Sequence, residues 1–424
     1  MRFARVASPE RRKALTVGIF LLRFPAPSET FIVSKLAGLL DAGIDLRIFT
    51  LVPSDAWDRF KGLDGRHDLR RRVRVAPPTR PLALALVAAP FAVAKAAFKS
   101  PAGVTRLALH SWRMRKKNGI GFIQGFYLRL PFVGERLDLL HIEFDWQGVG
   151  WADLKDLLGC RLLLSSRGAW GRTSVLHRFP AAAEYLFKRA DAYHVISDYL
   201  GRDLLALGCP REMPSRKIVP AVDLSLFTPP TARNKGPDEP LAIVSIGRLT
   251  WAKGYEFAID AIARACRAGV DLRYIIYGEG DYRDAIEFAA RQHGLFENGI
   301  VRFGGALARE QVPAALARAD LLLHAALEEG FCNAVIEAQA MELPVVSSDA
   351  GGLPENVEDG VTGYVVTRRD SLAMARRICE LASDPALRRR MGEAGRRRVL
   401  SHFNLDQQIA SFVALYKDIL AGRA

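Results

Sequence analysis

The chain alternates short, continuously apolar runs with stretches of helical periodicity. The first run, residues 15–22, precedes a helical pattern from Glu29 to Gly43, and a second run follows at 46–51. Further strand-length runs in this half are 137–142, 161–165 and 192–196. Strands that are apolar throughout, alternating with helices, predict a parallel sheet covered on both faces.

The same alternation restarts after a proline-rich segment, 228–240, which reads as an interdomain linker. Expected strands are 241–246, 272–277, 300–303, 321–324, 344–347 and 363–366, with helices at 254–268 and 282–293 among those between them. An amphipathic helix at 404–424 ends the chain, and we expect it to pack back toward the first domain. The predicted fold class is α/β, with two doubly wound Rossmann-like domains, 1–227 and 241–403, facing a central cleft where ligands bind.

Length and composition agree with two globular domains. The chain has 424 residues, of which 50% are hydrophobic and 25% charged, which excludes a disordered or fibrous protein. Its 5 cysteines are widely spaced and form no C-x-x-C pair. This excludes a disulfide scaffold and a zinc site built from neighbouring residues, and it fits a reducing cytosol.

The net charge of +14 is concentrated in one segment. Residues 66–117 hold thirteen Lys or Arg against a single acid, Asp68, and so supply +12 of it. A local excess of this kind indicates a surface that meets an anionic partner: nucleic acid, acidic phospholipid or a diphosphate-bearing substrate. The surrounding segment 60–130 interrupts the strand–helix rhythm and predicts an inserted group of two or three helices.

No segment reads as membrane-spanning. The longest apolar-rich run, 82–98, contains Pro90 and Lys95 and falls short of the about 20 residues that a spanning helix needs. The basic residues 11–13 precede an apolar run, but that run reaches Arg23 without a small-residue cleavage site. We therefore expect a buried first strand and a cytoplasmic protein.

Candidate chemistry gathers in the second half. In 247–254, G-R-L-T-W-A-K-G, a loop between a strand and a helix offers backbone N–H groups together with Arg248 and Lys253. Such a loop suits an anion, although a βα turn with solvated basic residues would look the same. Gly278-Glu279-Gly280 follows the next strand and by itself indicates only a turn.

The segment 329–337, E-G-F-C-N-A-V-I-E, is more specific. Glu329 lies in a loop and Glu337 one turn into a helix, within the otherwise nearly apolar stretch 334–341. Carboxylates accept hydrogen bonds from vicinal hydroxyls, and the amides of 331–333 lie at a predicted helix N-terminus. The alternative is that both glutamates are solvated helix charges. The strand, glycine pair and helix start of 344–355 would form the floor of the same pocket.

Four motifs in this order and spacing resemble those of the retaining nucleotide-sugar glycosyltransferases of family 4 (glycosyl transferases group 1), which have the GT-B fold. They are G-R-L-x-x-x-K-G, G-E-G, E-G-F-x-N-x-V-x-E-A and P-V-V-x-S-x-x-G-G-x-P-E, and the match covers 241–403. More thinly, F-P-A-P-S-E-T-F at 24–31 is similar to bacterial members that build exopolysaccharides of the colanic-acid type.

The resemblance implies roles for these residues. Arg248 and Lys253 would neutralise the donor diphosphate without a metal, Glu337 would hold the ribose hydroxyls, and Glu329 would grip the transferred sugar. The remaining donor-site residues would be Gly247, Gly278, Gly305, Gly330, Phe331, Cys332 and Asn333, with Gly305 against the base. The donor would be a UDP- or GDP-sugar, and no separate cofactor or metal is implied.

The chain also departs from the family pattern. Cys332 stands where a glycine is common, and the usual His-Gly of the first domain is replaced by Arg167-Gly168. Arginine stays protonated, so Arg167 can hydrogen-bond a sugar or phosphate but cannot act as a base. His141 matches the first position of the family's H-x-H-F pattern, with Glu143 at the second, although a histidine at a strand end is often structural. Both His141 and Arg167 are candidates for the role of the usual catalytic histidine.

The predicted function is transfer of a sugar, with retention, to a saccharide or lipid-diphosphate-linked acceptor in bacterial cell-surface polysaccharide synthesis. Residues 66–117 would meet an anionic membrane surface on the inner face of the cell membrane. The alternatives are a nucleotide-sugar epimerase on the same fold and a basic nucleic-acid-binding protein. The basic segment has few aromatics to stack bases and no nucleic-acid-binding motif, so we expect no nucleic-acid partner.

Overall fold

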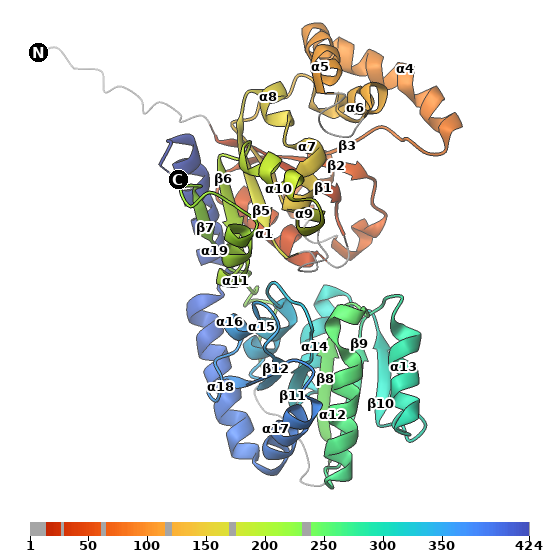
Figure 1. Cartoon of the computed structure of the whole chain (residues 1–424), viewed down its shortest axis with the longest axis vertical. Coiled ribbons are helices and arrows are strands. Elements are labelled where there is room, and N and C mark those ends of the chain that lie inside the picture. Colours follow the sequence, from red (N-terminus) through yellow and green to blue (C-terminus); the bar gives the residue numbers. More distant parts are fainter. Residues whose placement is uncertain are drawn as a thin grey trace, which may run out of the picture.

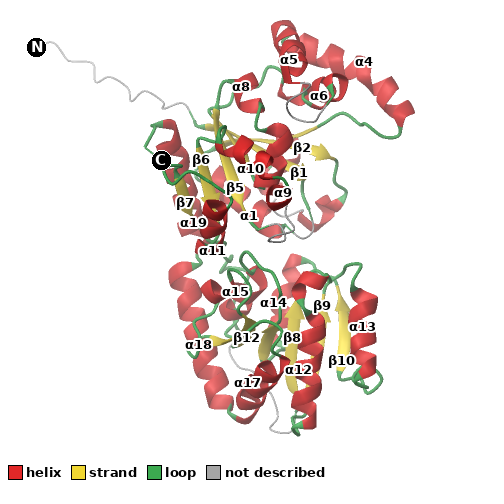
Figure 2. Cartoon of the chain, viewed as in Figure 1, coloured by secondary structure: helices red, strands yellow, loops and turns green. Residues whose placement is uncertain are grey.

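The computed structural model describes residues 14–26, 29–60, 65–114, 121–168, 175–230 and 239–423, which form two α/β domains stacked end to end (Figure 1). Each domain holds one fully parallel sheet, with strand orders β3-β2-β1-β4-β5-β6-β7 and β10-β9-β8-β11-β12-β13. Helices flank both sheets (Figure 2). The predicted fold class, two doubly wound domains, is confirmed.

The N-terminal sheet is built from buried apolar runs. Its strands are β1 (Thr16–Arg23), β2 (Asp45–Val52), β3 (Val73–Val75), β4 (Leu139–Ile142), β5 (Arg161–Ser166), β6 (Ala192–Val195) and β7 (Ser215–Lys217). The helices outside the inserted segment are α1 (Thr30–Asp41), α7 (Gly148–Trp151), α8 (Leu154–Leu158), α9 (Val175–Arg178), α10 (Pro180–Phe187) and α11 (Asp198–Ala206). The two edge strands, β3 and β7, are additions to the prediction.

The C-terminal sheet follows the predicted runs closely. Its strands are β8 (Leu241–Ile246), β9 (Leu272–Tyr277), β10 (Val301–Gly305), β11 (Leu321–His324), β12 (Val345–Ser348) and β13 (Gly363–Val366). The helices are α12 (Tyr255–Arg267), α13 (Arg283–Gln292), α14 (Val312–Ala317), α15 (Asn333–Ala340), α16 (Leu353–Asn356), α17 (Ser371–Ser383) and α18 (Pro385–His402). Helix α18 starts where the Asp384 side chain caps the Leu387 amide and Pro385 occupies the first turn.

The chain returns to the first domain at its end. After α18, helix α19 (Leu405–Leu420) packs against α1, with Phe412 and Tyr416 fully buried in the same core as Ile19 of β1. Burial of this apolar face holds α19 on the N-terminal domain.

The segment 60–130 contributes both a helical projection and a strand. Helices α4 (Leu82–Lys99), α5 (Pro101–Met114) and α6 (Phe122–Leu128) form the end of the molecule farthest from the C-terminal domain (Figure 1). Before them, α3 (Leu69–Arg72) leads into the edge strand β3, so the insertion is partly integrated into the sheet. Helix α4 runs through Pro90 without a break. Among the described residues, no helix combines the length and apolar character needed to cross a bilayer.

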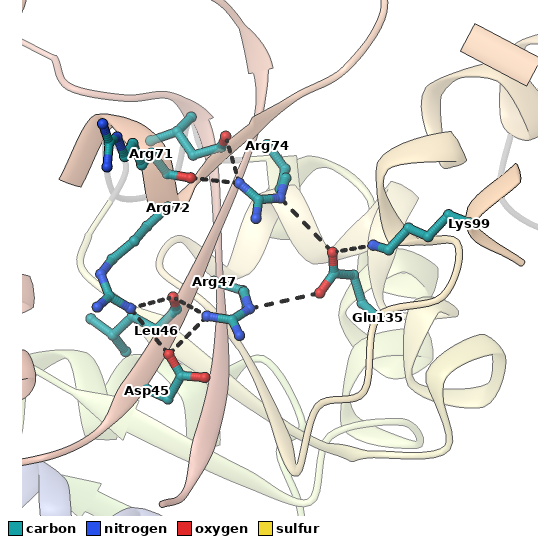
Figure 3. Close-up of polar contacts among 9 residues, drawn as sticks. Asp45, Leu46, Arg47, Arg71, Arg72, Arg74, Lys99 and Glu135 are labelled. Atoms are coloured by element: carbon teal, nitrogen blue, oxygen red, sulfur yellow. Dashed lines mark hydrogen bonds and ion pairs between the residues drawn. The ribbon is translucent and has the colours of Figure 1, made fainter. Parts of the chain in front are cut away.

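Part of the basic charge of 66–117 is neutralised inside the domain. Arg72 shares the Asp45 carboxylate with Arg47, at 3.1 and 2.8 Å, and Lys99 lies 2.6 Å from Glu135 (Figure 3). Arg74 approaches Glu135 at 3.9 Å and donates to the Arg71 carbonyl. These contacts tie β3 and α4 to the sheet, so only part of the excess charge remains for a partner.

Sheet topology fixes where ligands can bind. In each sheet the strand order reverses beside the first strand, between β1 and β4 and between β8 and β11. Loops that leave the carboxyl ends of those strands diverge and leave a crevice. The two crevices belong to the loops after β1 and β4 in one domain and after β8 and β11 in the other.

Candidate active site

The loop after β8 packs directly on the loop after β11. Gly254 has φ +58°, and a Cβ there would lie 2.2 Å from the Ala325 carbonyl oxygen. The close approach therefore requires glycine, and it sets Lys253, at the end of a short 3-10 turn (Trp251–Lys253), beside Glu329. Two motifs that are 76 residues apart in the sequence thus meet through one ion pair.

Charges in this cluster fix the state of Glu329. The Lys253 ammonium contacts Glu329 Oε2, and His324 Nε2 lies 3.3 Å from the same oxygen. Burial opposes ionisation, but Lys253 and His324 lower the pKa of Glu329 to about 2. Burial also opposes protonation of His324, yet Cys332 and Glu329 raise its pKa to about 9. Arg248 lines the same pocket and, with Lys253, offers two cations to a diphosphate, while Asp145, Asp203 and Glu328 also line it.

The predicted glycines of the donor site form backbone contacts between neighbouring strand ends. The Gly278 amide donates to the Gly305 carbonyl at 2.8 Å, and the Gly247 amide donates to Tyr277. Gly278 has φ +149°, and a Cβ there would lie 1.9 Å from the Gly247 carbonyl oxygen. These three glycines therefore lie together at the carboxyl edge of the C-terminal sheet.

Helix α15 carries two polar side chains, Glu337 and Asn333, that the fold leaves incompletely satisfied. Glu337 is half-buried, and burial raises its pKa to about 7 although Arg309 opposes the shift. The Asn333 Oδ1 atom is buried and has no hydrogen-bond partner among the described residues. Both side chains are thus poised to gain from a polar ligand.

One part of the predicted amide cradle is wrong. The Cys332 amide is not available, because it donates to Asn356 Oδ1 at 3.1 Å, and Asn356 Nδ2 donates back to the Cys332 carbonyl. The Phe331 ring is buried against Phe403, with centroids 5.6 Å apart. The amides of 331 and 333 remain as the donors that this helix start offers.

The two domains enclose a pocket. Its lining from the C-terminal domain includes Arg248, Lys253, Glu329 and Gly330, and its lining from the N-terminal domain includes Gly168 and Tyr199. A Cβ on Gly330 would lie 2.9 Å from the Arg167 carbonyl oxygen, so the two domains touch at this point. Glu337, Gly278 and Gly305 lie outside this pocket.

A carboxylate links the domains beside the pocket. Glu355 of α16 accepts hydrogen bonds from the Asp198 and Tyr199 amides at the start of α11, both at 2.9 Å. Lys217 Nζ lies 3.6 Å from the same carboxylate. The predicted floor motif 344–355 therefore ends in a residue that bridges to the opposite domain.

Arg167 lies in a cluster of buried charges. Its Nη2 donates to Glu143 Oε2 at 2.7 Å, its Nε donates to the Glu143 carbonyl at 3.1 Å, and Lys35 pairs with Glu143 Oε1. Glu29, at the start of α1, is a further carboxylate influenced by this cluster, and burial raises its pKa to about 7 although the charges of Arg167 and Arg248 lower it. Sequence reasoning missed Glu29 and Lys35. Glu29 lies within residues 24–31, the segment similar to exopolysaccharide-building members, whereas Lys35 lies in no recognisable motif.

His141 does not fit the role of a group that touches substrate. It is fully buried, with Nδ1 2.9 Å from the Tyr416 hydroxyl and Nε2 2.6 Å from Ser165 Oγ. Ser165 continues to His194 Nδ1 at 2.7 Å, and His194 Nε2 lies 2.9 Å from the Ile218 carbonyl. A carbonyl only accepts, so His194 donates there and the whole chain is satisfied with both imidazoles neutral. Burial accordingly lowers the pKa of His141 to about 3.

A metal ion has one candidate position within the described ranges. His324, Glu329 and Cys332 offer ligand atoms that all lie within 4.8 Å of one another. The Lys253 ammonium contacts the same Glu329 oxygen and would repel a cation there. The arrangement is better suited to an anion.

Two doubly wound domains with a pocket between them are the architecture of the GT-B glycosyltransferases. The model for "Glycosyl transferase 4-like domain" matches residues 28–214, and that for "Glycosyl transferases group 1" matches 231–398. The chain belongs to this family of glycosyltransferases. It is 30% identical to the GDP-mannose-dependent alpha-(1-6)-phosphatidylinositol monomannoside mannosyltransferase of Mycolicibacterium smegmatis, over 69% of this chain and 81% of that protein.

Other relatives match over most of their length. A putative colanic acid biosynthesis glycosyltransferase of Escherichia coli (strain K12) is 29% identical, over 86% of this chain and 90% of that protein. The Anabaena HepE structure in complex with UDP and glucose superposes with a TM-score of 0.68 at 19% identity, covering 95% of this chain and 100% of that one. At that identity the likeness supports the fold alone.

Proposed function

We propose that this glycosyltransferase takes a sugar from a nucleoside-diphosphate sugar, with retention and without a metal, and passes it to a saccharide or lipid-linked acceptor in bacterial cell-surface polysaccharide synthesis. The observation that carries the proposal is that Arg248 and Lys253 line the interdomain pocket together with Glu329, whose carboxylate Lys253 and His324 hold ionised. The colanic acid relative supports the polysaccharide class.

The chemistry follows from where charge develops. As the bond from the sugar C1 to the diphosphate oxygen breaks, its electron pair goes to the phosphate, where Arg248 and Lys253 stabilise it. The acceptor oxygen forms its bond to C1 on the same face and gives its proton to a leaving phosphate oxygen. Glu337 would hold the ribose hydroxyls, Glu329 the sugar hydroxyls, and Arg167 would hydrogen-bond the sugar from the opposite domain.

A thermal-shift panel of UDP-, GDP- and ADP-sugars tests this proposal. A donor that binds the native state raises the melting temperature through linkage. We expect one base to give a clear shift that Lys253→Ala removes. A flat response to every donor would contradict the proposed function.

Donor affinity should increase as the pH rises through about 7. Burial raises the pKa of Glu337 to about 7, so below that pH the side chain is protonated and accepts hydrogen bonds from the ribose poorly. Binding then requires loss of a proton, and the dissociation constant should rise up to about tenfold per pH unit on the acid side. Calorimetry with an intact nucleotide sugar, from about pH 5.5 to about pH 8, measures it.

Glu337→Gln is the control for this pH dependence. This variant should bind the donor more weakly, and its affinity should change less with pH because the titrating carboxyl group is gone. Any pH dependence that remains would come from Glu29 and His324, which also have shifted pKa values. An unchanged profile in the variant would show that another group titrates.

We also propose that α4–α6 dock on an anionic membrane surface, where a lipid-linked acceptor would be presented. Phe91, Phe98 and Ile123 are 73%, 96% and 79% exposed on these helices. No acidic residue occurs between Asp68 and Glu135, whereas Lys95 and the arginines of α5 are exposed. Exposed apolar rings beside basic residues match the headgroup boundary of an anionic leaflet.

Liposome co-sedimentation tests the docking face. Replacing Phe91 and Phe98 by Ser should weaken binding to anionic vesicles by roughly tenfold per ring, given the free energy of burying an aromatic side chain. Phe288→Ser is the matched control, because Phe288 is 62% exposed on α13 of the other domain. Equal pelleting of the two variants, or no preference for anionic over neutral lipid, would contradict the proposal.

A further inference from the structure

We infer that Lys35 and Glu143 are positioning residues that hold the Arg167 guanidinium beside the interdomain pocket, which the next residue, Gly168, lines, with one edge of the guanidinium left for a ligand oxygen. The inference rests on the proposed function and deepens it, because it names the groups that orient Arg167 toward the donor sugar or phosphate.

Glu143 is divided between two cations. Its Oε1 pairs with Lys35 and its Oε2 accepts from Arg167 Nη2 at 2.7 Å, while its carbonyl accepts from Arg167 Nε at 3.1 Å. The Lys35, Glu143 and Arg167 side chains are only 2%, 0% and 6% exposed. The two hydrogen bonds that Arg167 Nη2 and Nε donate to Glu143 fix the plane of the guanidinium.

Lys35 prevents full pairing of Arg167. A carboxylate facing a guanidinium alone would take it in a two-pronged contact and neutralise it. With Oε1 occupied, Arg167 reaches only Oε2, and its Nη1 has no hydrogen-bond partner among the described residues. The three side chains together carry one net positive charge. Burial lowers the pKa of Lys35 to about 8, partly offset by Glu143, so the lysine is still largely charged at neutral pH.

The guanidinium has a further support within its own domain. It lies 5.2 Å from the centre of the Phe31 ring, which supports one face of it. The Arg167 carbonyl meets Gly330, next to Glu329. The N-terminal domain therefore supports the Arg167 guanidinium, while the backbone of the same residue touches the C-terminal domain.

The role is distinct from that of the neighbouring histidine chain. His141, Ser165 and His194 satisfy one another and end at the Ile218 carbonyl, with no bond to Arg167. Glu143 instead directs both of its oxygens to cations, Lys35 and Arg167.

Chemical rescue tests the inference. In Arg167→Ala, the carboxylate and carbonyl of Glu143 and the Phe31 ring should bind free guanidinium ion. Millimolar guanidinium chloride should then raise the melting temperature of this variant relative to equal sodium chloride, and leave wild type unchanged. It should also restore at least part of the nucleoside-diphosphate release that the variant loses, with UDP-glucose or GDP-mannose as the donor, whichever shifts the wild-type melting temperature.

The second variants separate positioning from folding. Arg167→Ala with Glu143→Gln should lose both rescues, and methylammonium, which lacks the fork, should rescue neither variant. Lys35→Met should lower kcat while leaving the donor KM unchanged, because Arg167 is then captured by Glu143. Full activity of Arg167→Ala, equal rescue with and without Glu143, or wild-type kcat in Lys35→Met would overturn the inference. If activity also survives Lys253→Ala, the proposed donor site itself fails.

Discussion

Lys253→Ala is expected to reduce release of nucleoside diphosphate from the sugar donor to near background. The ammonium lies in the interdomain pocket and is the cation closest to Glu329. A donor of this kind, aimed at charge that develops on the leaving group, contributes about 3–4 kcal/mol, or roughly a hundred- to a thousandfold in rate. The loss also leaves the Glu329 carboxylate facing the diphosphate without its main counter-charge.

The measurement compares Lys253→Ala with Lys188→Ala, which removes an exposed lysine at the end of α10 that pairs with Glu184 of that helix. Circular dichroism and melting temperature should show that both variants fold. Lys188→Ala should keep wild-type rates. Glu337→Gln should be inactive for a different reason, loss of the ribose contact. Full activity of Lys253→Ala or Glu337→Gln would rule out the assigned donor site.

The sequence was sufficient for most of the fold because long apolar runs form central strands. Strands β9 and β11 have the predicted bounds, and β8 does too. The edge strands β3 and β7 were missed because each has three residues and no fully buried position, so neither leaves an apolar run in the sequence. The inserted helices were foreseen, but the pairing of β3 with β2 depends on a contact across the insertion.

The sequence predicts the site residues of the C-terminal domain better than those of the N-terminal domain. In the C-terminal domain each candidate lies in a contiguous motif that follows a strand, so Arg248, Lys253 and Glu329 were found together. In the N-terminal domain the cluster is made by Lys35 and Glu143, which are 108 residues apart. The state of His141 was equally inaccessible, because Tyr416, which satisfies it, lies 275 residues away on the returning helix. Such pairings follow from tertiary packing, not from local pattern.

Arg129→Met is expected to lower the free energy of unfolding by about 3–5 kcal/mol, because it leaves the buried Asp153 carboxylate without its permanently charged partner and with His110 beside it. The Arg129 and Asp153 side chains are 1% and 0% exposed, and Nη2 donates to Asp153 Oδ1 at 2.9 Å and to the Gly150 carbonyl at 2.7 Å. Burial favours the neutral acid, but hydrogen bonds from His110 and Arg129 lower the pKa of Asp153. The guanidinium also stacks on Trp151 at 4.6 Å.

Chemical denaturation at neutral pH measures this loss, with Arg216→Met as the control. Arg216 pairs with Asp418 at 2.9 Å, but both side chains are about a third exposed, so its removal should cost at most about 1 kcal/mol. Arg129→Met combined with Asp153→Leu should recover part of the stability, since no buried charge is then left unpaired. Because the depressed pKa of Asp153 gives stability that is present above its unfolded value and lost as the pH falls, the gap between wild type and Arg129→Met should shrink in acid. Equal losses for Arg129→Met and Arg216→Met would contradict the expectation that the buried pair contributes more stability than the exposed one.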